Sequence, residues 1–471
     1  MLYQEAFARA QIVAIHPILQ ESMNVRIQYF HYLQSLIEIL KINSHEKNID
    51  TVKWMDVNSQ IDCYKEILCG RQDYKINSRF AYLLPADLAI IFSLRRKYAL
   101  HEMDIIPNFI DIARKISFDF NLESNDDIFL VTLFEAILSE ATRNRVTLNL
   151  IQDARLAPFR NYLEKVRRNS LFIKKAPYKI LVTATMSAGK STLINAITGK
   201  NICAAQNLAC TSKIHTIISK PFDDELKSYF YEDSSYAQSA DEQLKDDLSS
   251  WDAVSLFFNG TLQGQRLLFF DSPGVNSSMN EDHMKISRDM IASKKYNLLL
   301  YVLNATQLGT TDDEEHLKFI AEHIGDIKVI FIMNKADQLL SEETPIADVI
   351  ARQREFLISK GFQDPMIYPV SARAAFLAKK SQSCQLTRSE QREFNNYVDK
   401  FEEMSLSTYY RENLGCDRFP ISHDEAKDLI RDCGLIYLES RIMRLCKHKQ
   451  KNERKKSPNK RKKRSKSKKK R

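Results

Sequence analysis

The stretch YKILVTATMSAGKSTLINAITG, residues 178–199, decides the fold of this chain. An apolar run from Ile180 to Val182 is typical of a strand, and a helical pattern begins near Thr192. Between them, Ala184 to Ser191 follows the pattern G-x-x-x-x-G-K-S with alanine in place of the first glycine. Alanine is small, so this replacement weakens the pattern without changing the expected geometry. The order strand, loop, helix predicts a loop that binds phosphate at a helix N-terminus.

Each residue type in this loop suits a nucleotide phosphate. Gly189 permits close approach of the backbone, Lys190 reaches the β- and γ-phosphate oxygens, and the Ser191 hydroxyl is a ligand for Mg²⁺. Backbone N–H groups at the start of a helix attract anions, because they have no acceptor within the helix. The expected phosphate site consists of Ser187, Ala188, Gly189, Lys190, Ser191 and Thr192.

A second segment, LLFFDSPG at residues 267–274, is an apolar strand that ends in an aspartate. We expect Asp271 to hold Mg²⁺ through a water molecule and the Gly274 N–H to contact the γ-phosphate. Taken alone, the same letters also fit an ordinary turn.

Two later segments indicate the base. Residues 330–337, IFIMNKAD, form a strand pattern that ends in N-K-x-D, and Ser371-Ala372-Arg373 follows the strand pattern of residues 366–370. The Asp337 carboxylate can accept two N–H groups that guanine offers and adenine lacks, and the Ala372 N–H is expected to donate to guanine O6. A helix cap would also explain Asn334 to Asp337, but four such segments after four strands predict a guanine-nucleotide site. The expected base-binding residues are Asn334, Lys335, Asp337, Ser371, Ala372 and Arg373.

A threonine that contacts both Mg²⁺ and the γ-phosphate should lie between the first helix and the second strand. Thr211, in the segment Ala209 to Ser212, is our choice. Thr216 is the main alternative, although we expect it to start or line a strand around Ile217 and Ile218.

The spacing of glycine separates the domains. Eight of the 11 glycines fall between residues 189 and 361, whereas residues 1–188 contain only Gly70. Because helices avoid glycine, we predict a helical region over 1–176 and a doubly wound α/β domain with a mainly parallel sheet over 177–380. A helical segment over 381–446 should follow, with a last helix that is capped near Ser422 and reaches about Cys446. Residues 447–471 are rich in Lys, Arg and Ser and are predicted to be disordered.

These motifs resemble the GTPase domain of bacterial dynamin-like proteins. The resemblance covers about 177–380 and rests on SAGKSTLINAITG, Cys210-Thr211, DSPG, NKAD and SAR, and on the 81 residues that separate Lys190 from Asp271. It implies a P-loop GTPase that hydrolyses GTP to GDP and phosphate with Mg²⁺, by attack of water on the γ-phosphate. The residues implied in catalysis are Lys190, Ser191, Thr211, Asp271 and Gly274, with Ser191, Thr211 and Asp271 around the metal. It also implies a homo-oligomer formed through a dimer of GTPase domains.

The chain departs from this family at one position and from Ras-type enzymes at another, where the dynamin family also lacks their glutamine. Met186 stands where dynamin-family loops often have a glutamine that organises water, and Val275 follows Gly274 where Ras-type enzymes have a catalytic glutamine. Hydrolysis should therefore be slow or depend on self-association. A non-hydrolysing GTP-gated scaffold is an alternative that fits these two residues.

Charge is concentrated at one end of the chain. Residues 447–471 hold 16 Lys and Arg and one acid, a net charge of +15, whereas residues 1–446 carry −6. This segment could bind anionic lipid headgroups, nucleic acid or neither, and an RNA- or ribosome-associated GTPase is the corresponding alternative function. The eight cysteines show no metal-binding spacing, and no apolar run is long enough to span a membrane, so we expect a cytoplasmic protein with peripheral membrane attachment as an option.

Overall fold

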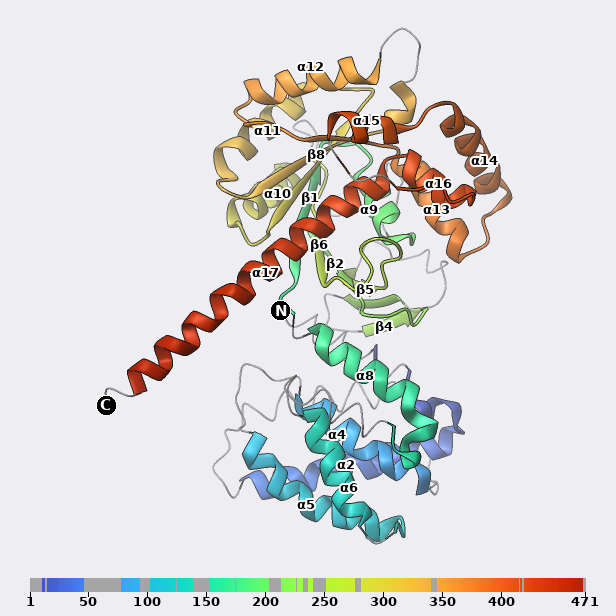
Figure 1. The fold of residues 1–471 in the computed structure, drawn as a ribbon, viewed down its shortest axis with the longest axis vertical. Coiled ribbons are helices and arrows are strands. Elements are labelled where there is room, and N and C mark those ends of the chain that lie inside the picture. The colour runs from blue at the N-terminus through green and yellow to red at the C-terminus, as the bar shows by residue number, and fades with distance from the viewer. Residues whose placement is uncertain are drawn as a thin grey trace. The chain divides into compact units, whose positions relative to one another are not determined.

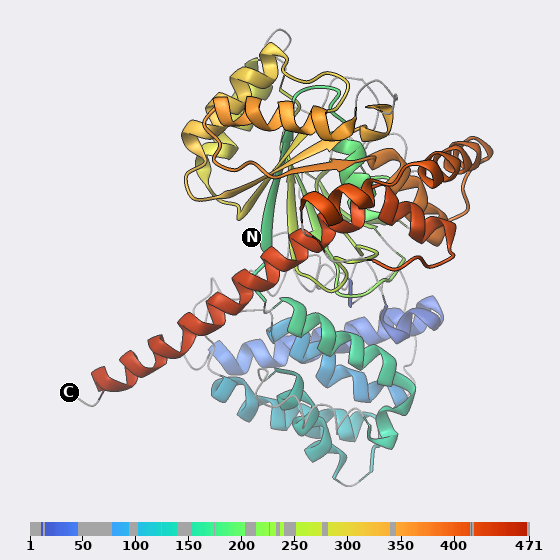
Figure 2. The ribbon, with the colours of Figure 1, turned by 45° about the horizontal axis from the view of Figure 1, so that its top comes forward.

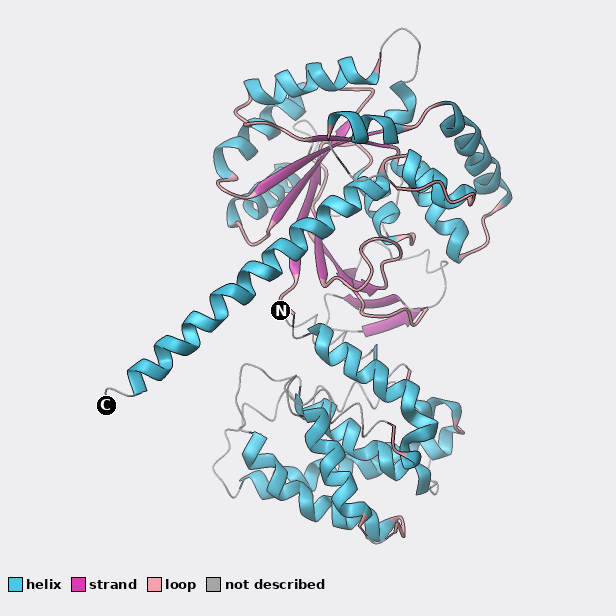
Figure 3. Ribbon diagram, in the orientation of Figure 1, coloured by secondary structure: helices cyan, strands magenta, loops and turns pink. Residues whose placement is uncertain are grey.

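The computed structural model describes residues 11–12, 15–45, 78–93, 102–123, 125–138, 152–173, 175–202, 213–225, 227–231, 236–239, 251–275, 281–339, 345–414, 416 and 419–468. The chain divides into two compact units, Met1–Lys175 and Ala176–Arg471. Figure 3 shows that the described part of the first unit is helical, whereas the second contains a sheet.

The first unit is a helical unit with its own apolar core. Leu33, Leu36 and Ile37 are buried, as are Phe109, Ile112 and Ile116, in agreement with the helical spacing of both sets. The rings of Phe109 and Phe134 are stacked with their centroids 3.8 Å apart. The helices, including three 3-10 helices (η), are η1 Pro17–Gln20, α2 Met23–His45, η2 Ser78–Leu83, α4 Leu84–Ser93, α5 Glu102–Asp119, α6 Asp126–Leu138, η4 Ala154–Phe159 and α8 Arg160–Ile173.

In the described residues of the second unit, nine strands form one sheet in the order β4-β3-β5-β2-β6-β1-β7-β8-β9. Strands β6, β1, β7, β8 and β9 run parallel, and β2 is antiparallel to β6. The predicted α/β fold with a mainly parallel sheet is confirmed. The strands are β1 Tyr178–Ala184, β2 His215–Ser219, β3 Lys227–Tyr231, β4 Tyr236–Ser239, β5 Trp251–Leu256, β6 Leu267–Asp271, β7 Leu298–Asn304, β8 Lys328–Asn334 and β9 Ile367–Val370.

Helices cover both faces of the sheet (Figure 1). Successive side chains of a strand point to opposite faces, so Leu298 and Leu300 join one core while Leu299 and Tyr301 join the other. Helices α10, α11 and α12 pack on the second face, and α9, α13 and α16 on the first. Figure 2 gives a second view of this layering. The helices are α9 Lys190–Thr198, α10 Glu281–Ser293, α11 Thr311–His323, η5 Ala336–Leu339, α12 Ile346–Ser359, α13 Ala372–Ser383, α14 Arg388–Glu403, α15 Leu406–Asn413, α16 Glu425–Asp432 and α17 Leu435–Lys468.

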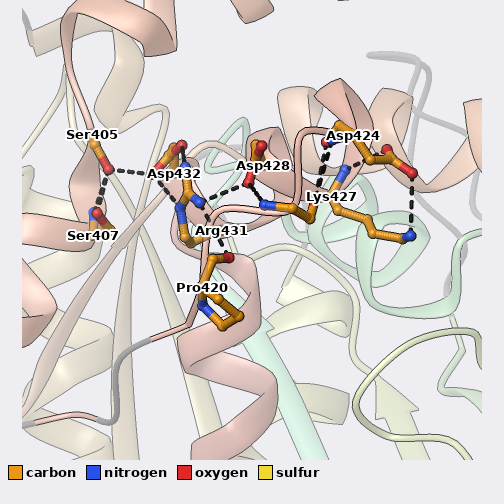
Figure 4. A network of polar contacts seen from close by, with 9 residues as sticks. Ser405, Ser407, Pro420, Asp424, Lys427, Asp428, Arg431 and Asp432 are labelled. Atoms are coloured by element: carbon orange, nitrogen blue, oxygen red, sulfur yellow. Dashed lines mark hydrogen bonds and ion pairs between the residues drawn. The ribbon is translucent and has the colours of Figure 1, made fainter.

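The segment after α13 shares the core of the sheet. Phe394, Tyr410 and Leu438 are buried in the same cluster as the strands. Arg431 of α16 donates to the Pro420 carbonyl before the helix at 3.3 Å and to Asp428 within the helix at 2.7 Å (Figure 4). These helices are therefore an integral part of the second unit.

The C-terminal helix differs from the prediction in two ways. The expected single helix from the Ser422 region to Cys446 is two helices, because Gly434 breaks it with a backbone φ of +90°. A Cβ at this position would lie 2.5 Å from the Pro369 carbonyl oxygen, so the close approach also requires glycine. Helix α17 then continues to Lys468, through most of the segment predicted to be disordered, since Lys and Arg are good helix formers.

No helix among the described residues is long and apolar enough to cross a membrane.

Candidate nucleotide site

The phosphate loop lies between β1 and α9, as the sequence predicts. Ala184 is the last residue of β1, and Gly189 is the N-cap of α9. The first helical hydrogen bond runs from the Leu193 N–H to the Gly189 carbonyl at 2.9 Å. The N–H groups of Lys190, Ser191 and Thr192 precede it and so have no acceptor within the helix. This arrangement presents donors to an anion, with the positive end of the helix dipole behind them.

Gly189 could not be another residue. Its φ is +85°, and a Cβ added to it would lie 2.2 Å from the Asn334 side-chain nitrogen. Ser187 also has a positive φ, of 60°. The loop thus turns through a conformation that leaves its backbone free to surround a ligand.

The predicted Mg²⁺ residue Asp271 lies at the carboxyl end of β6, next to the loop. Lys190 Nζ forms an ion pair with the Asp271 carboxylate, and both side chains are about nine-tenths buried. The His215 ring also lies near this pair, and burial lowers its pKa, with the nearby lysines acting in the same direction. Sequence reasoning missed His215, because only its pairing opposite Asp271 in the sheet brings it here.

The segment after Asp271 is tied to the loop by backbone hydrogen bonds. The Val275 N–H donates to the Ala184 carbonyl at 3.1 Å, and the Met186 N–H donates to the Val275 carbonyl at 3.3 Å. Val275 itself is buried. Gly274 lies against Met186, since a Cβ on it would be 3.5 Å from Met186 Cγ. Neither Met186 nor Val275 brings a polar side chain to this part of the site.

Asn334 joins three of the predicted motifs. Its side-chain nitrogen donates to the Ala188 carbonyl at 2.9 Å, and its side-chain oxygen accepts from the Ala372 N–H at 3.0 Å. Asn334 is buried. It therefore joins the phosphate loop to the loop at the start of α13. Ala188 and Ala372 are 146 and 38 residues away from Asn334 in sequence.

The base-binding residues lie around this junction. Asp337, in the 3-10 helix η5, is 6% exposed, and Lys335 has a φ of +62°. The Ser371 hydroxyl oxygen is buried and lacks a hydrogen-bond partner among the described residues. The Ala372 N–H, which we expected to meet guanine O6, donates to Asn334 instead, because Ala372 is the first residue of α13 and faces the Asn334 amide. The N–H groups of Arg373 and Ala374 lie in the first turn of that helix and have no acceptor within it, because the first helical hydrogen bond is from the Ala375 N–H to the Ser371 carbonyl.

Arg373 is paired with Glu393 of the next helix, α14. Its guanidinium forms two hydrogen bonds with Glu393 of α14, at 2.8 and 2.6 Å. Tyr397, one turn further along α14, has a pKa raised by burial and by the negative charges of Asp337 and Glu393. Helix α14 thus borders the base side of the site, a contribution that no local motif revealed.

The two threonine candidates have different outcomes. Thr211 lies outside the described residues. Thr216 lies within β2, opposite Phe270 of β6, as expected for the rival that lines a strand.

Residues 180–336 match the dynamin family. This segment is a dynamin-family GTPase domain. The match covers the loop, Asp271 and Asn334, and it ends just before Asp337.

Relatives of the dynamin-family domain are distant. An uncharacterised protein in the xynA 3′ region of Caldicellulosiruptor sp. strain Rt8B.4 is 22% identical over 253 residues, which are 52% of this chain and 59% of that protein. The bacterial dynamin-like protein of Nostoc punctiforme is 22% identical over 194 residues, 38% of this chain and 27% of that one. An oligomerised bacterial dynamin pair, described as sensing and tethering membranes over long range, aligns with 83% of this chain and 61% of its own. That alignment has a TM-score of 0.35 and 16% identity. The chain spans at most about three-fifths of each of these proteins.

Proposed function

We propose that this chain binds GTP and hydrolyses it to GDP and phosphate. The observation that carries the proposal is the position of Asn334, which hydrogen-bonds both the phosphate loop and the loop at the start of α13. A phosphate site and a base site that are joined by one side chain can hold one nucleotide. The dynamin-family match over residues 180–336 supports the same conclusion.

The residues fit a nucleotide phosphate and Mg²⁺. Gly189 approaches Asn334 so closely that no Cβ fits, which leaves backbone to line the site, and Lys190 supplies a partly buried positive charge. In the nucleotide-bound protein Lys190 would exchange its Asp271 partner for phosphate oxygens. Ser191 and Asp271 would then hold Mg²⁺, whose charge offsets the negative charge that develops on the phosphate.

Guanine is the base that these residues favour. The Asp337 carboxylate is nearly buried, so an N–H donor that reaches it replaces lost water contacts. Guanine offers two such donors on one edge, and adenine does not. The buried Ser371 hydroxyl, at the start of α13, has no hydrogen-bond partner among the described residues and provides a further hydrogen-bonding group.

Self-association is the second part of the proposal. Met186 and Val275 offer no side chain that could orient water, so an isolated chain should turn over GTP slowly. A second copy that contacts the site could supply or order the missing group, as the family membership of this domain suggests. The basic C-terminal residues further suggest attachment to anionic membranes, with each Lys or Arg near such a surface contributing about 1 kcal/mol.

Two measurements test this proposal. In a competition titration, GTP and GDP should bind the full-length protein at least about a hundredfold more tightly than ATP. Phosphate release per chain should then rise with protein concentration. Equal affinity for ATP would overturn the choice of guanine, and binding without release at any concentration would favour a GTP-gated scaffold. Stimulation by RNA but not by anionic liposomes would favour the RNA-associated alternative.

A further inference from the structure

We propose that Asp313, a buried carboxylate in the first turn of α11, positions the phosphate loop by accepting a hydrogen bond from Thr185. Thr185 is the second residue of the loop, and its hydroxyl donates to Asp313 Oδ1 at 3.0 Å. Asp313 is 1% exposed. This inference rests on the proposed function, because it concerns the loop that would bind the nucleotide phosphates.

Asp313 is itself held rigidly. The Tyr301 hydroxyl of β7 donates to the same oxygen at 2.8 Å, and the Thr310 hydroxyl donates to the other oxygen at 3.1 Å. The Asp313 N–H donates back to the Thr310 hydroxyl at 3.2 Å, which caps the helix. The carboxylate therefore connects the loop to β7 and to the start of α11 by hydrogen bonds. A side chain needed only as a cap would make the Thr310 contacts without reaching Thr185.

The loop needs such a contact at this residue. At its far end, the Ala188 carbonyl is held by Asn334 at 2.9 Å. At its near end, the chain leaves β1 after Ala184 and soon enters the positive-φ region at Ser187. At Thr185 the sheet pairing is reduced to an isolated backbone bridge with Val275, and the hydrogen bond to Asp313 adds a side-chain contact at this residue. With both ends fixed, the backbone N–H groups between them are preorganised for a phosphate.

The same helix offers a matched control. One turn after Asp313, the His316 Nε2 lies 3.1 Å from the Thr183 hydroxyl, which is two residues earlier in the chain than Thr185. Both contacts join a threonine hydroxyl near the end of β1 to the first two turns of α11. Thr183, however, lies within β1 and pairs with Tyr301 of β7 in the regular backbone ladder, whereas Thr185 has only an isolated bridge. Removal of the Thr183 hydroxyl should therefore not move the loop.

The test compares Thr185→Val with Thr183→Val in the full-length protein, together with Thr185→Ser, Asp313→Asn and the double variant Thr185→Val/Asp313→Asn. The kcat at saturating GTP should fall about tenfold or more in Thr185→Val and stay within about threefold of wild type in Thr183→Val, since small misplacements of positioning groups cost large factors in rate. Thr185→Ser keeps the hydroxyl and should restore most of the rate. The double variant should be no slower than the slower single variant, because Thr185→Val already removes the contact through which residue 313 acts on the loop. Multiplicative losses in the double variant, or equal losses in Thr183→Val and Thr185→Val, would overturn the role of Asp313.

Hydrogen exchange of the nucleotide-free protein separates this inference from the proposed function. Backbone amides of residues 186–191 should exchange faster in Thr185→Val than in wild type and should be unchanged in Thr183→Val. This readout needs neither GTP binding nor turnover, so it decides the inference even if the wild-type protein fails to hydrolyse GTP. Wild-type turnover alone decides the proposed function. Unchanged exchange in Thr185→Val would refute the positioning role whatever the wild-type activity, and it would do so even if Asp313→Asn failed to fold.

Discussion

The two units of the chain each bury an aspartate that accepts hydrogen bonds from hydroxyl groups, but the two aspartates contact different kinds of segment. In the helical unit, Asp87 is fully buried and accepts from Tyr29 and from Tyr162, the latter at 3.3 Å. His16 accepts the Ile18 N–H at Nδ1, so its Nε2 carries the proton that reaches Asp87 at 3.0 Å. In the sheet unit, Asp313 also accepts from a tyrosine, but it has one contact in the phosphate loop.

The partners of a buried carboxylate indicate whether it contributes to the stability of the fold or to the geometry of a binding site. His16, Tyr29 and Tyr162, which contact Asp87, are all buried in the helical unit, so we expect that network to contribute to stability. The contact of Asp313 with Thr185 instead reaches the loop that we expect to bind the nucleotide phosphates. Substitutions should therefore separate into two groups, one that changes unfolding and one that changes turnover.

The largest effect should come from Lys190→Ala. Loss of the cation of the loop should lower kcat/KM for GTP by on the order of a thousandfold, because it supplies charge stabilisation where negative charge develops. The unfolding of the helical unit should not change. Steady-state phosphate release and chemical denaturation would be measured on the same samples. Normal turnover by this variant would show that the loop is not the catalytic phosphate site.

Asp87→Ala should give the reverse pattern. It leaves a buried imidazole N–H and two buried tyrosine hydroxyls without their acceptor, and each such group costs about 1–3 kcal/mol. We expect the helical unit to lose about 3 kcal/mol or more of unfolding free energy, while GTP affinity stays within about twofold. Denaturant titration with a parallel nucleotide titration checks both. If the loss of GTP-binding free energy were as large as the loss of unfolding free energy, the two units would be coupled and their separate roles would be refuted.

His316 should make the stability of the sheet unit depend on pH. Burial, with the nearby Arg288 charge, lowers the pKa of His316 to about 3 from its usual 6.5. The folded protein therefore resists protonation of His316, whereas the unfolded chain takes up a proton below about pH 6.5. The contribution of His316 to the free energy of unfolding is therefore complete above pH 6.5 and declines as the pH falls toward 3. Between pH 7 and pH 5 the decline should be about 2 kcal/mol. The pKa of Asp313 is raised by burial and acts in the opposite direction, so the quantity to compare is the difference between wild type and His316→Gln.

His316→Gln cannot be protonated in this range, so its stability should fall by about 2 kcal/mol less than that of wild type between pH 7 and pH 5. Denaturation midpoints at pH 7, 6 and 5 would measure this. Identical pH profiles would show that His316 is accessible to protons in the folded protein.

The smallest effect on turnover should follow truncation of the basic segment. Lys449 lies over the ring of Tyr178 at the start of β1, at 5.9 Å, so a deletion should spare this contact and begin at Glu453. Residues 453–471 carry 13 Lys and Arg and one acid, a net charge of +12, and their removal changes the formal net charge from +9 to −3. Binding to anionic liposomes or RNA at low salt should largely disappear, whereas basal turnover should stay within about twofold. Retained polyanion binding would place a basic face elsewhere on the chain.

Much of the sheet unit could be predicted because its signals are local. A strand that ends in Asp271 or in Asn334 places those residues at one edge of a parallel sheet, and the order of the motifs predicts their convergence. The contact between Thr185 and Asp313 joins residues 128 positions apart, and sequence alone indicated for Asp313 only a helix cap. The pattern Thr311-Asp312-Asp313-Glu314 predicts the capped start of this helix, and the cap residue is Thr310, one position earlier.

Other features depended on competition between local and tertiary effects. The helical pattern from the Ser422 region onward continues across Gly434, and only the approach of the Pro369 carbonyl and Tyr410 explains the break there. The ties between α14 and the base side of the site also join distant segments, such as Arg373 and Glu393. Composition favoured disorder after residue 446, whereas helix propensity favoured continuation of α17, and the two rules conflict at the same residues.

We expect Asp337 to recognise guanine in a site that Asn334 joins to the phosphate loop. The most direct measurement is a titration of wild type and Asp337→Asn with GTP and with xanthosine triphosphate. An asparagine amide offers a donor where xanthine presents its extra carbonyl, so the variant should prefer xanthosine triphosphate, and wild type should prefer GTP, each by about a hundredfold. A variant that still preferred GTP, or a wild type that bound both nucleotides equally, would contradict the account.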